Sequence, residues 1–442
     1  MHCYCGVWNN DYSKCVEKKM KTNTKEDIKM IKYLEDKRVS LMLVIVCFVT
    51  YIIIGFTRNA YSAAIVGIIS EGYFTKSQAG VIATSFNITY CLSQIVGSYF
   101  VDKISPFKII IMGTIVTIFA NIAMSINPTY WVIFIARGVC GIAQFGIWPA
   151  ILRILSEYVN EQHRYTWRYI LPLGITAGSV VSYIGAALVT NWRGLFTLSY
   201  VLMAIATMVF IITSRYADKK AVVRVIEQKI RKNAEDKKTE TEKISVFKLM
   251  TTSGTLFFII PIFIRSLING GIANWMPTML MESYGVSPAI SSVMTTISTI
   301  ANFAAVFWVV LLYPRVFKLQ STAMGMFFLF TAPFLLGTAF IGKMPMILVV
   351  IFLTVTNTFK NSIHQFNTVE VPGAFTKYNK AGMVAGLVNS VATGAGILSG
   401  WLWGFMAENY SWNVIILVWA AMAFLSAICC FAATPLWKRF VL

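Results

Sequence analysis

The chain has 442 residues, of which 57% belong to the hydrophobic set and 13% are charged, and its mean hydropathy is +0.66. A water-soluble protein of this length carries about twice that charged fraction, so the composition is typical of a membrane protein. The 31 Phe and 12 Trp residues exclude a disordered chain, and the distribution of the net charge of +19 fits membrane topology rather than nucleic-acid binding.

The first segment, residues 1–38, is predicted to be a polar basic tail. It is rich in Lys, Arg, Asp and Glu and has no apolar run of the kind found in a signal peptide. Cys3, Cys5 and Cys15 fall in this tail, without the second ligand pair that a metal site requires. We therefore expect reduced thiols, with no metal site and no disulfide framework.

Twelve apolar stretches follow, each long enough to cross a hydrocarbon core of about 30 Å. They are expected at residues 39–69, 77–101, 107–126, 130–154, 166–190, 194–214, 250–281, 287–313, 320–341, 344–369, 380–407 and 412–433. They form two groups of six, at 39–214 and 249–433, separated by a charged linker at 215–248 and followed by a tail at 434–442. This pattern predicts an all-α membrane protein.

The basic residues predict the orientation, because Lys and Arg of short loops stay on the cytoplasmic side. One side of the expected spans carries the N-terminal tail, Lys103, Lys108, Arg164, Arg168, residues 215–248, Arg315, Lys318, Lys377, Lys380, Lys438 and Arg439. The other side carries only Lys76, Arg193 and Lys343. We therefore expect a multi-pass protein of the cell membrane with both termini in the cytoplasm.

A weak internal repeat supports two homologous halves. A shift of 211 residues places Glu71-Gly-Tyr73 on Glu282-Ser-Tyr284, at equivalent points of the two groups of six. Repeated halves are typical of transporters whose site lies between them.

Several motifs then resemble the major facilitator superfamily. Arg137-Gly-Val-Cys-Gly141 resembles its fourth-span motif, and Asp102-Lys103 resembles its loop motif. Gly141-Ile-Ala-Gln-Phe-Gly-Ile-Trp-Pro149, Thr57-Arg58, Trp275-Met-Pro-Thr278 and Gly382-Met-Val-Ala-Gly-Leu-Val-Asn389 are similar to two organic-anion branches, the anion:cation symporters and the organophosphate:phosphate antiporters. The resemblance implies two pseudo-symmetric six-helix bundles and a carrier rather than an enzyme.

The two branches differ at two positions. Gln144 stands where the symporters carry a coupling Glu and the antiporters a Gln. Asn269 stands where the antiporters carry a second phosphate-binding Arg on the seventh span. The resemblance therefore favours a carboxylate, such as a sugar acid, over a phosphate ester.

Cations inside the apolar stretches are the main site candidates, because an unpaired charge inside a membrane is costly. Arg58, Arg137 and Lys360 lie in such stretches, whereas the acidic residues fall in tails, loops or span ends. This pattern suits an anionic substrate, with Arg58 as the bidentate anchor. The complete set of expected substrate-binding residues is Arg58, Tyr90, Arg137, Gln144, Asn269, Lys360 and Asn389.

Structural roles remain alternatives for these residues. Arg58 would then pair with a polar neighbour, Arg137 would extend to the membrane interface, and Lys360 would reach water along a cavity. Arg265 is expected to lie too close to the cytoplasmic end to take part.

His364 lies one helical turn from Lys360 and is the candidate for proton coupling, since its reference pKa of about 6.5 allows titration near neutral pH. We expect a monomeric carrier that moves a small organic anion by alternating access, by symport or exchange. No ATP-binding loop is present, and no cofactor or metal is expected. The alternatives are an efflux carrier for drugs or metabolites, or a transporter-like anion sensor.

Overall fold

The fold is described from a computed structural model of the chain. It describes residues 28–101, 104–159, 164, 166, 167, 170–189, 191–227, 246–305, 309, 312, 315–378 and 380–441. Cys3, Cys5, Cys15, Asp102 and Lys103 lie outside these ranges.

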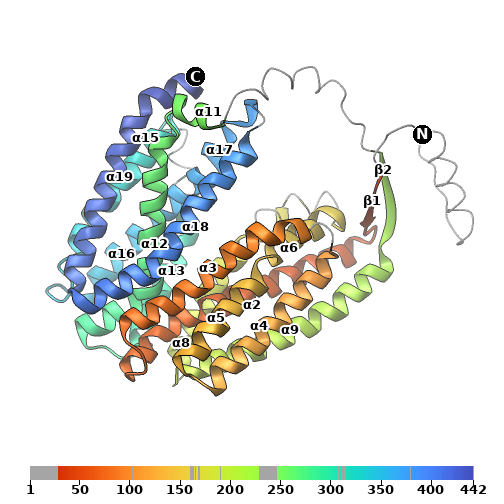
Figure 1. Ribbon diagram of the computed structural model, residues 1–442, viewed down its shortest axis with the longest axis horizontal. Helices are drawn as coiled ribbons and strands as arrows, with labels where there is room; N and C mark the ends of the chain where they lie inside the picture. The colour runs from red at the N-terminus through yellow and green to blue at the C-terminus, as the bar shows by residue number, and fades with distance from the viewer. Residues whose placement is uncertain are drawn as a thin grey trace, which may run out of the picture.

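The structure confirms the all-α membrane fold with two helical bundles (Figure 1). The N-terminal bundle consists of α2 (Lys37–Ser70), α3 (Lys76–Val101), α4 (Pro106–Ile126), α5 (Tyr130–Gln144), α6 (Ile147–Glu157), α8 (Leu173–Leu188) and α9 (Arg193–Lys220). The C-terminal bundle consists of α11 (Val246–Thr252), α12 (Leu256–Tyr284), α13 (Pro288–Ile300), η2 (Ala301–Ala304), α15 (Gln320–Thr338), α16 (Met346–Gln365), η3 (Phe366–Glu370), α17 (Val371–Gly373), η4 (Thr376–Tyr378), α18 (Ala381–Asn409) and α19 (Trp412–Val441). Within the described ranges, nine helical segments have the length and hydropathy needed to cross a membrane, and α8 is a shorter apolar helix.

Two expected spans are interrupted. The span expected at 130–154 is divided into α5 and α6 at Phe145 and Gly146. Pro149 has no backbone N–H, so the carbonyl of Phe145 loses the hydrogen bond that would continue the helix. The span expected at 344–369 changes from α-helix to the π-helical η3 after Gln365, just before Pro372. Such π turns often occur at functional sites.

A small sheet was not predicted from the sequence. Strand β1 (Ile28–Tyr33) pairs antiparallel with β2 (Val222–Glu227), and Ile28 lies opposite Glu227. One strand comes from the expected N-terminal tail and the other from the expected linker. The ribbon therefore joins the chain just before α2 to the chain just after α9.

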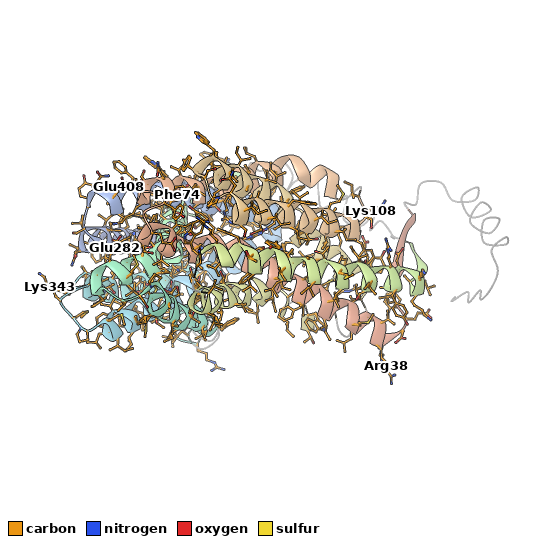
Figure 2. All side chains as sticks on the ribbon, turned by 90° about the horizontal axis from the view of Figure 1, so that it is seen from below. Arg38, Phe74, Lys108, Glu282, Lys343 and Glu408 are labelled. Atoms are coloured by element: carbon orange, nitrogen blue, oxygen red, sulfur yellow. The ribbon has the colours of Figure 1, made fainter. Side chains whose placement is uncertain are left out.

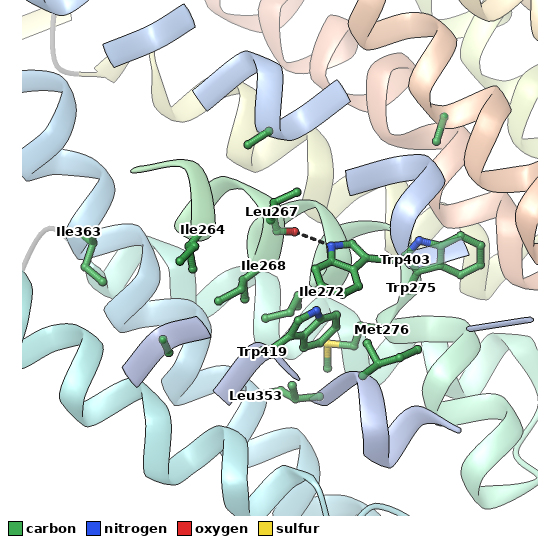
Figure 3. Packing of buried hydrophobic residues seen from close by; sticks show 14 of the residues in the cluster. Ile264, Leu267, Ile268, Ile272, Trp275, Met276, Leu353, Ile363, Trp403 and Trp419 are labelled. Carbon is green, nitrogen blue, oxygen red and sulfur yellow. Dashed lines mark hydrogen bonds between the residues drawn. The ribbon is translucent and has the colours of Figure 1, made fainter. Parts of the chain in front are cut away.

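The C-terminal bundle is held together by buried tryptophans. Trp403 on α18 donates a hydrogen bond from Nε1 to the carbonyl of Leu267 on α12 at 2.8 Å (Figure 3). Its ring meets the ring of Trp419 on α19 edge to face at 5.4 Å. Indole rings combine a large apolar surface with one donor, so these two contacts join α18 to α12 and to α19.

The internal repeat is visible as a matching pair of hydrogen bonds. Trp192 at the start of α9 donates to Glu71 at the end of α2 at 3.0 Å, and Trp412 at the start of α19 donates to Glu282 near the end of α12 at 2.8 Å. Each bundle thus closes its first and sixth spans with the same Trp–Glu pair. This correspondence supports the repeat inferred from Glu71 and Glu282.

The bundles are in contact at one end of the molecule, which we call the closed end. There, Ser62 of α2 donates to Asn274 of α12 at 2.6 Å, and Thr84 of α3 donates to the carbonyl of Ile397 at 3.0 Å. A Cβ on Gly80 would lie 2.3 Å from the carbonyl oxygen of Gly400, so these two helices touch through their backbones. Figure 2 shows Phe74, Glu282, Lys343 and Glu408 toward this end and Lys108 and Arg38 toward the other.

At the opposite end, which we call the open end, the bundles diverge (Figure 1). The first half of α18 exposes Met383 and Leu387, whereas Ala395 and Gly400 in its second half are buried. A Cβ on Gly386 would meet nothing within 4 Å. The interior between the bundles is therefore accessible from the end that carries β1, β2 and the C-terminus.

Candidate functional site

The first cationic centre lies inside the N-terminal bundle around Arg58. Its Nε donates to Oε1 of Gln144 on α5 at 3.3 Å. The guanidinium carbon lies 4.8 Å from the ring centre of Tyr90 and 5.4 Å from that of Phe86, both on α3. Cation–π contacts of this kind hold a guanidinium in place without neutralising it. The structure thus brings together the predicted residues Arg58, Tyr90 and Gln144.

Arg137 completes this centre. It is only 4% exposed, and its Nη1 donates to the backbone carbonyl of Arg58 at 3.2 Å. Its guanidinium carbon lies 4.7 Å from the ring of Phe86 and 5.1 Å from that of Tyr61. Arg137 therefore points into the bundle and does not extend to the membrane interface, which was the structural alternative considered for it.

A close helix contact places the aromatic rings beside the two arginines. A Cβ on Gly141 of α5 would lie 2.1 Å from Oγ1 of Thr89 and 2.5 Å from the carbonyl oxygen of Phe86. Only glycine allows α5 to approach α3 this closely. The Arg-x-x-x-Gly motif therefore supplies both the cation, Arg137, and the contact that brings Phe86 next to it.

No described carboxylate balances these charges inside the bundle. The described acidic side chains lie at helix ends or in adjoining segments: Glu35, Asp36, Glu71, Glu157, Asp218, Glu282, Glu370 and Glu408. Two guanidinium groups without a counter-charge in the middle of a spanning bundle favour the binding of an anion from solution.

A second cationic centre lies in the C-terminal bundle. Arg265 on α12 is 7% exposed and donates from Nε to the carbonyl of Lys360 at 3.4 Å and from Nη2 to Oδ1 of Asn361 at 3.3 Å. Lys360 is 4% exposed, and its Nζ donates to Oδ1 of Asn357 at 2.6 Å. Asn361 in turn donates to Asn302. The buried Lys360 ammonium is thus bound by an amide oxygen and does not extend to water.

A small hollow adjoins this second centre. It has a volume of about 10 Å³ and is lined by Ile262, Arg265, Ser266, His364, Asn367, Thr368, Val388, Asn389 and Ala392. Two predicted residues, His364 and Asn389, therefore meet at Arg265. Asn269 lies on α12 but does not line this hollow. An apolar pocket of about 150 Å³ lies beside the hollow and shares Ile262 and Val388 with it.

Sequence reasoning missed three members of the second centre. Arg265 was expected to lie too near the membrane surface, and Asn361 and Asn367 were not singled out. The available signal was the spacing of polar residues along α16 and η3, where Asn357, Asn361 and His364 recur at three- or four-residue intervals. Such spacing places them on one helix face. No group of three or more His, Cys, Asp or Glu residues with metal-binding geometry occurs in the part of the chain that the structure describes.

The amino-acid sequence was compared with known protein families and known proteins. The sequence model of the Major Facilitator Superfamily matches residues 47–365. A probable hexose phosphate transport protein of Chlamydia trachomatis is 28% identical over 174 residues, which cover 39% of this chain and 38% of that protein. The glycerol-3-phosphate transporter of Bacillus subtilis is 22% identical over 268 residues, which cover 57% of this chain and 60% of that protein. The chain thus matches less than two thirds of the length of either relative.

The fold also matches that of solved transporters. The crystal structure of the peptide transporter POT in complex with sulfate superimposes with a TM-score of 0.66 at 15% sequence identity, covering 90% of this chain and 95% of that one. At this identity the likeness concerns the fold alone. The match to the family model over residues 47–365, with the apolar helices long enough to cross a membrane, shows that the chain is a multi-pass membrane protein and belongs to the major facilitator superfamily.

Proposed function

We propose that the protein is a secondary carrier that moves a small phosphate-bearing organic anion across the cell membrane by alternating access. The observation that carries this proposal is the pair of guanidinium groups, Arg58 and Arg137, inside a spanning bundle without a described carboxylate beside them. A transported anion would supply the missing negative charge.

Arg58 is the residue that would bind the substrate. It makes its one hydrogen bond through Nε, so neither of its Nη groups has a partner among the described residues. Its side chain is half-buried, whereas Arg137 is buried behind it. Two free Nη groups in one plane match two oxygens of a phosphate or carboxylate. Tyr90 and Gln144 would hold the guanidinium in position for that contact.

A phosphate ester is favoured here over the carboxylate that the sequence suggested. That preference depended on Asn269, which replaces a second arginine of the antiporter branch. However, Arg265 lies one helical turn before Asn269 on α12 and supplies a cation to the same bundle. The names of the two relatives described above, a hexose phosphate protein and a glycerol-3-phosphate transporter, support the same substrate class. A doubly charged phosphate is also better matched by cations from both bundles.

The arrangement of the bundles supports alternating access. Contacts between the bundles are made at the closed end, and the interior is accessible from the open end. In our proposal the open end faces the cytoplasm, because the basic loops gather there. Movement of the substrate would then require the closed end to open while the open end closes, with the anion held between the two cationic centres.

Transport by the purified protein in proteoliposomes tests the proposal. Vesicles loaded with inorganic phosphate would be given labelled glycerol 3-phosphate, a hexose 6-phosphate or a sugar acid. We expect uptake of at least one ester, in competition with external phosphate, and little uptake of the sugar acid. Uptake of the sugar acid alone would show that the substrate is a carboxylate. Binding of an ester without transport in either direction would identify a sensor.

A further inference from the structure

We infer that Arg265, Ser266 and Asn367 form a second oxyanion site, in the C-terminal bundle. The site would accept one oxygen of a phosphoryl group, carried either by inorganic phosphate or by a phosphate ester. The inference depends on the proposed function only for the identity of the anion. It assigns no role to Asn269, which the sequence suggested instead.

The first argument is an unpaired buried amide. Asn367 on η3 is 2% exposed, and neither its Oδ1 nor its Nδ2 has a partner among the described residues. Ser266 is also buried, and its Oγ likewise lacks a partner in the described ranges. Buried polar groups are nearly always hydrogen-bonded, because leaving one unpaired costs about 1–3 kcal/mol. Two such groups on the wall of one hollow indicate a ligand that supplies the missing bonds.

The second argument is the fixed position of the cation. Arg265 is held through Nε by the carbonyl of Lys360 and through Nη2 by Asn361. Its remaining nitrogen, Nη1, has no hydrogen bond with a described residue. Because the two existing bonds set the plane of the guanidinium, the third nitrogen needs little reordering when an anion binds. Arg265 thus adds a charge to the neutral donors of Ser266 and Asn367.

The third argument is charge balance. Lys360 adds a second cation next to Arg265, and among the described residues its ammonium is bound by the neutral amide of Asn357 and by no carboxylate. The described acidic residues of this bundle, Glu282, Glu370 and Glu408, lie near helix ends. The hollow is therefore surrounded by positive charge and neutral donors, which is the environment that favours an oxyanion.

The size of the hollow limits what can enter. A volume of about 10 Å³ accommodates about one water-sized group, which corresponds to a single oxyanion oxygen and not to a whole ester. Asn389 on α18 lies at the same hollow and is exposed, so the rest of the ligand would lie on its side. The site would therefore hold the tip of a phosphoryl group while the remainder stays in the space between the bundles.

Equilibrium binding of radiolabelled inorganic phosphate to the purified full-length protein tests the inference. The measurements would use an Arg58→Gln background, so that binding at the N-terminal centre is removed. Two further substitutions, Arg265→Gln and Asn367→Leu, are then added singly. Lys343→Gln is the matched control, since it removes one exposed cation at the closed end.

We expect the Arg58→Gln protein to retain saturable phosphate binding. Arg265→Gln should weaken that binding by roughly tenfold or more, as should Asn367→Leu, because each removes a hydrogen bond to a charged ligand. Lys343→Gln should leave it unchanged. Asn367→Leu should not lower the melting temperature of the unliganded protein, since the amide it removes has no partner among the described residues and leucine is of similar size.

The inference is overturned if Arg58→Gln alone abolishes saturable phosphate binding, or if Asn367→Leu leaves the phosphate affinity of that background unaltered. If the Arg265→Gln protein does not fold, the phosphate affinity of the Asn367→Leu protein tests the inference by itself. Competition by glycerol 3-phosphate distinguishes the two sources of the oxyanion: displacement of phosphate assigns the site to phosphoryl groups in general, and no displacement assigns it to inorganic phosphate. These binding results are separate from the transport assay, so a failure of the proposed function would be recognised independently.

Discussion

Lys76 of the N-terminal bundle and Glu282 of the C-terminal bundle form an ion pair of 2.8 Å at the closed end. The same ammonium donates to the carbonyl of Ala407 at 3.1 Å, and Glu282 also accepts from Trp412. The pair is partly exposed, so its contribution is expected to be about 1 kcal/mol or less. Even so, 1 kcal/mol changes a two-state ratio about fivefold, which is enough to influence how often the closed end opens.

The first prediction concerns this ion pair. Glu282→Gln removes the charge but keeps an acceptor for Trp412. In a protein with Ser62→Cys as the probe, we expect soluble maleimide to label the probe about two to five times faster in Glu282→Gln, because the closed end opens more often. Glu157→Gln is the matched control, since its ion pair with Arg153 lies within one bundle. Equal labelling rates in all three proteins would refute the role of the pair.

The second prediction concerns Arg58. Arg58→Lys keeps the charge but cannot offer two coplanar Nη donors, so we expect substrate uptake to fall at least tenfold at a concentration well below the apparent affinity constant. The variant should still reach the membrane in normal amounts. Arg38→Lys is the control, because Arg38 is exposed at the start of the same helix. Near-normal uptake by Arg58→Lys would mean that Arg58 has a structural role only.

The third prediction concerns the glycine contact between α3 and α18. A methyl group at Gly80 would collide with the carbonyl oxygen of Gly400, so Gly80→Ala should force the closed end apart. We expect faster labelling of the same Ser62→Cys probe. Gly386→Ala adds the same group on α18 at the open end, where the Cβ would meet no described atom within 4 Å, and should leave the labelling rate unchanged. Identical labelling rates for Gly80→Ala and Gly386→Ala would show that the contact between Gly80 and Gly400 does not hold the closed end together.

The fourth prediction concerns membrane orientation. Lys343 lies at the closed end and Lys108 toward the opposite one (Figure 2). If the basic loops are cytoplasmic, an impermeant thiol reagent applied to intact cells should label Lys343→Cys and not Lys108→Cys in a cysteine-free protein. Both should be labelled after the cells are permeabilised. Labelling of Lys108→Cys alone from outside would reverse the proposed topology.

The fifth prediction concerns proton coupling through His364. Arg265 on α12 lines the same hollow as His364, and Lys360 lies one helical turn before His364 on α16. If transport is proton-coupled, His364→Gln should lose accumulation driven by a pH gradient while keeping exchange of substrate across the membrane. Counterflow and pH-jump assays in proteoliposomes measure the two activities. Proton-driven accumulation that persists in this variant would exclude His364.

The N-terminal centre could largely be predicted from the sequence, whereas the C-terminal one could not. Arg58, Arg137 and Gln144 belong to recognisable motifs, Tyr90 was also expected to bind the substrate, and the structure brings all four together. Arg265 is buried inside its bundle, whereas the sequence suggested a position near a span end, because span boundaries read from hydropathy are uncertain by a few residues and helices tilt. Its neighbours Lys360 and Asn361 lie on α16, far along the chain from Arg265, and a local sequence pattern does not predict such a contact.

The same limit explains the missed interruptions and the missed sheet. The break at Phe145 depends on the loss of one hydrogen bond at Pro149, which leaves the hydropathy of the span unchanged. The β1–β2 pairing joins residues 28–33 to residues 222–227, and neither strand alone carries a signal strong enough to predict the other. Hydropathy therefore indicates which segments are apolar enough to cross the membrane, but not where a helix within such a segment is interrupted.

The β1–β2 ribbon has a consequence for the connectivity of the molecule. One strand lies just before α2 and the other just after α9, so they join the two ends of the N-terminal bundle to each other. A cut of the polypeptide anywhere between residues 228 and 245 would leave this fastening intact. The contacts at the closed end would then hold the two separate chains together. We therefore expect that the protein can be assembled from two co-expressed fragments.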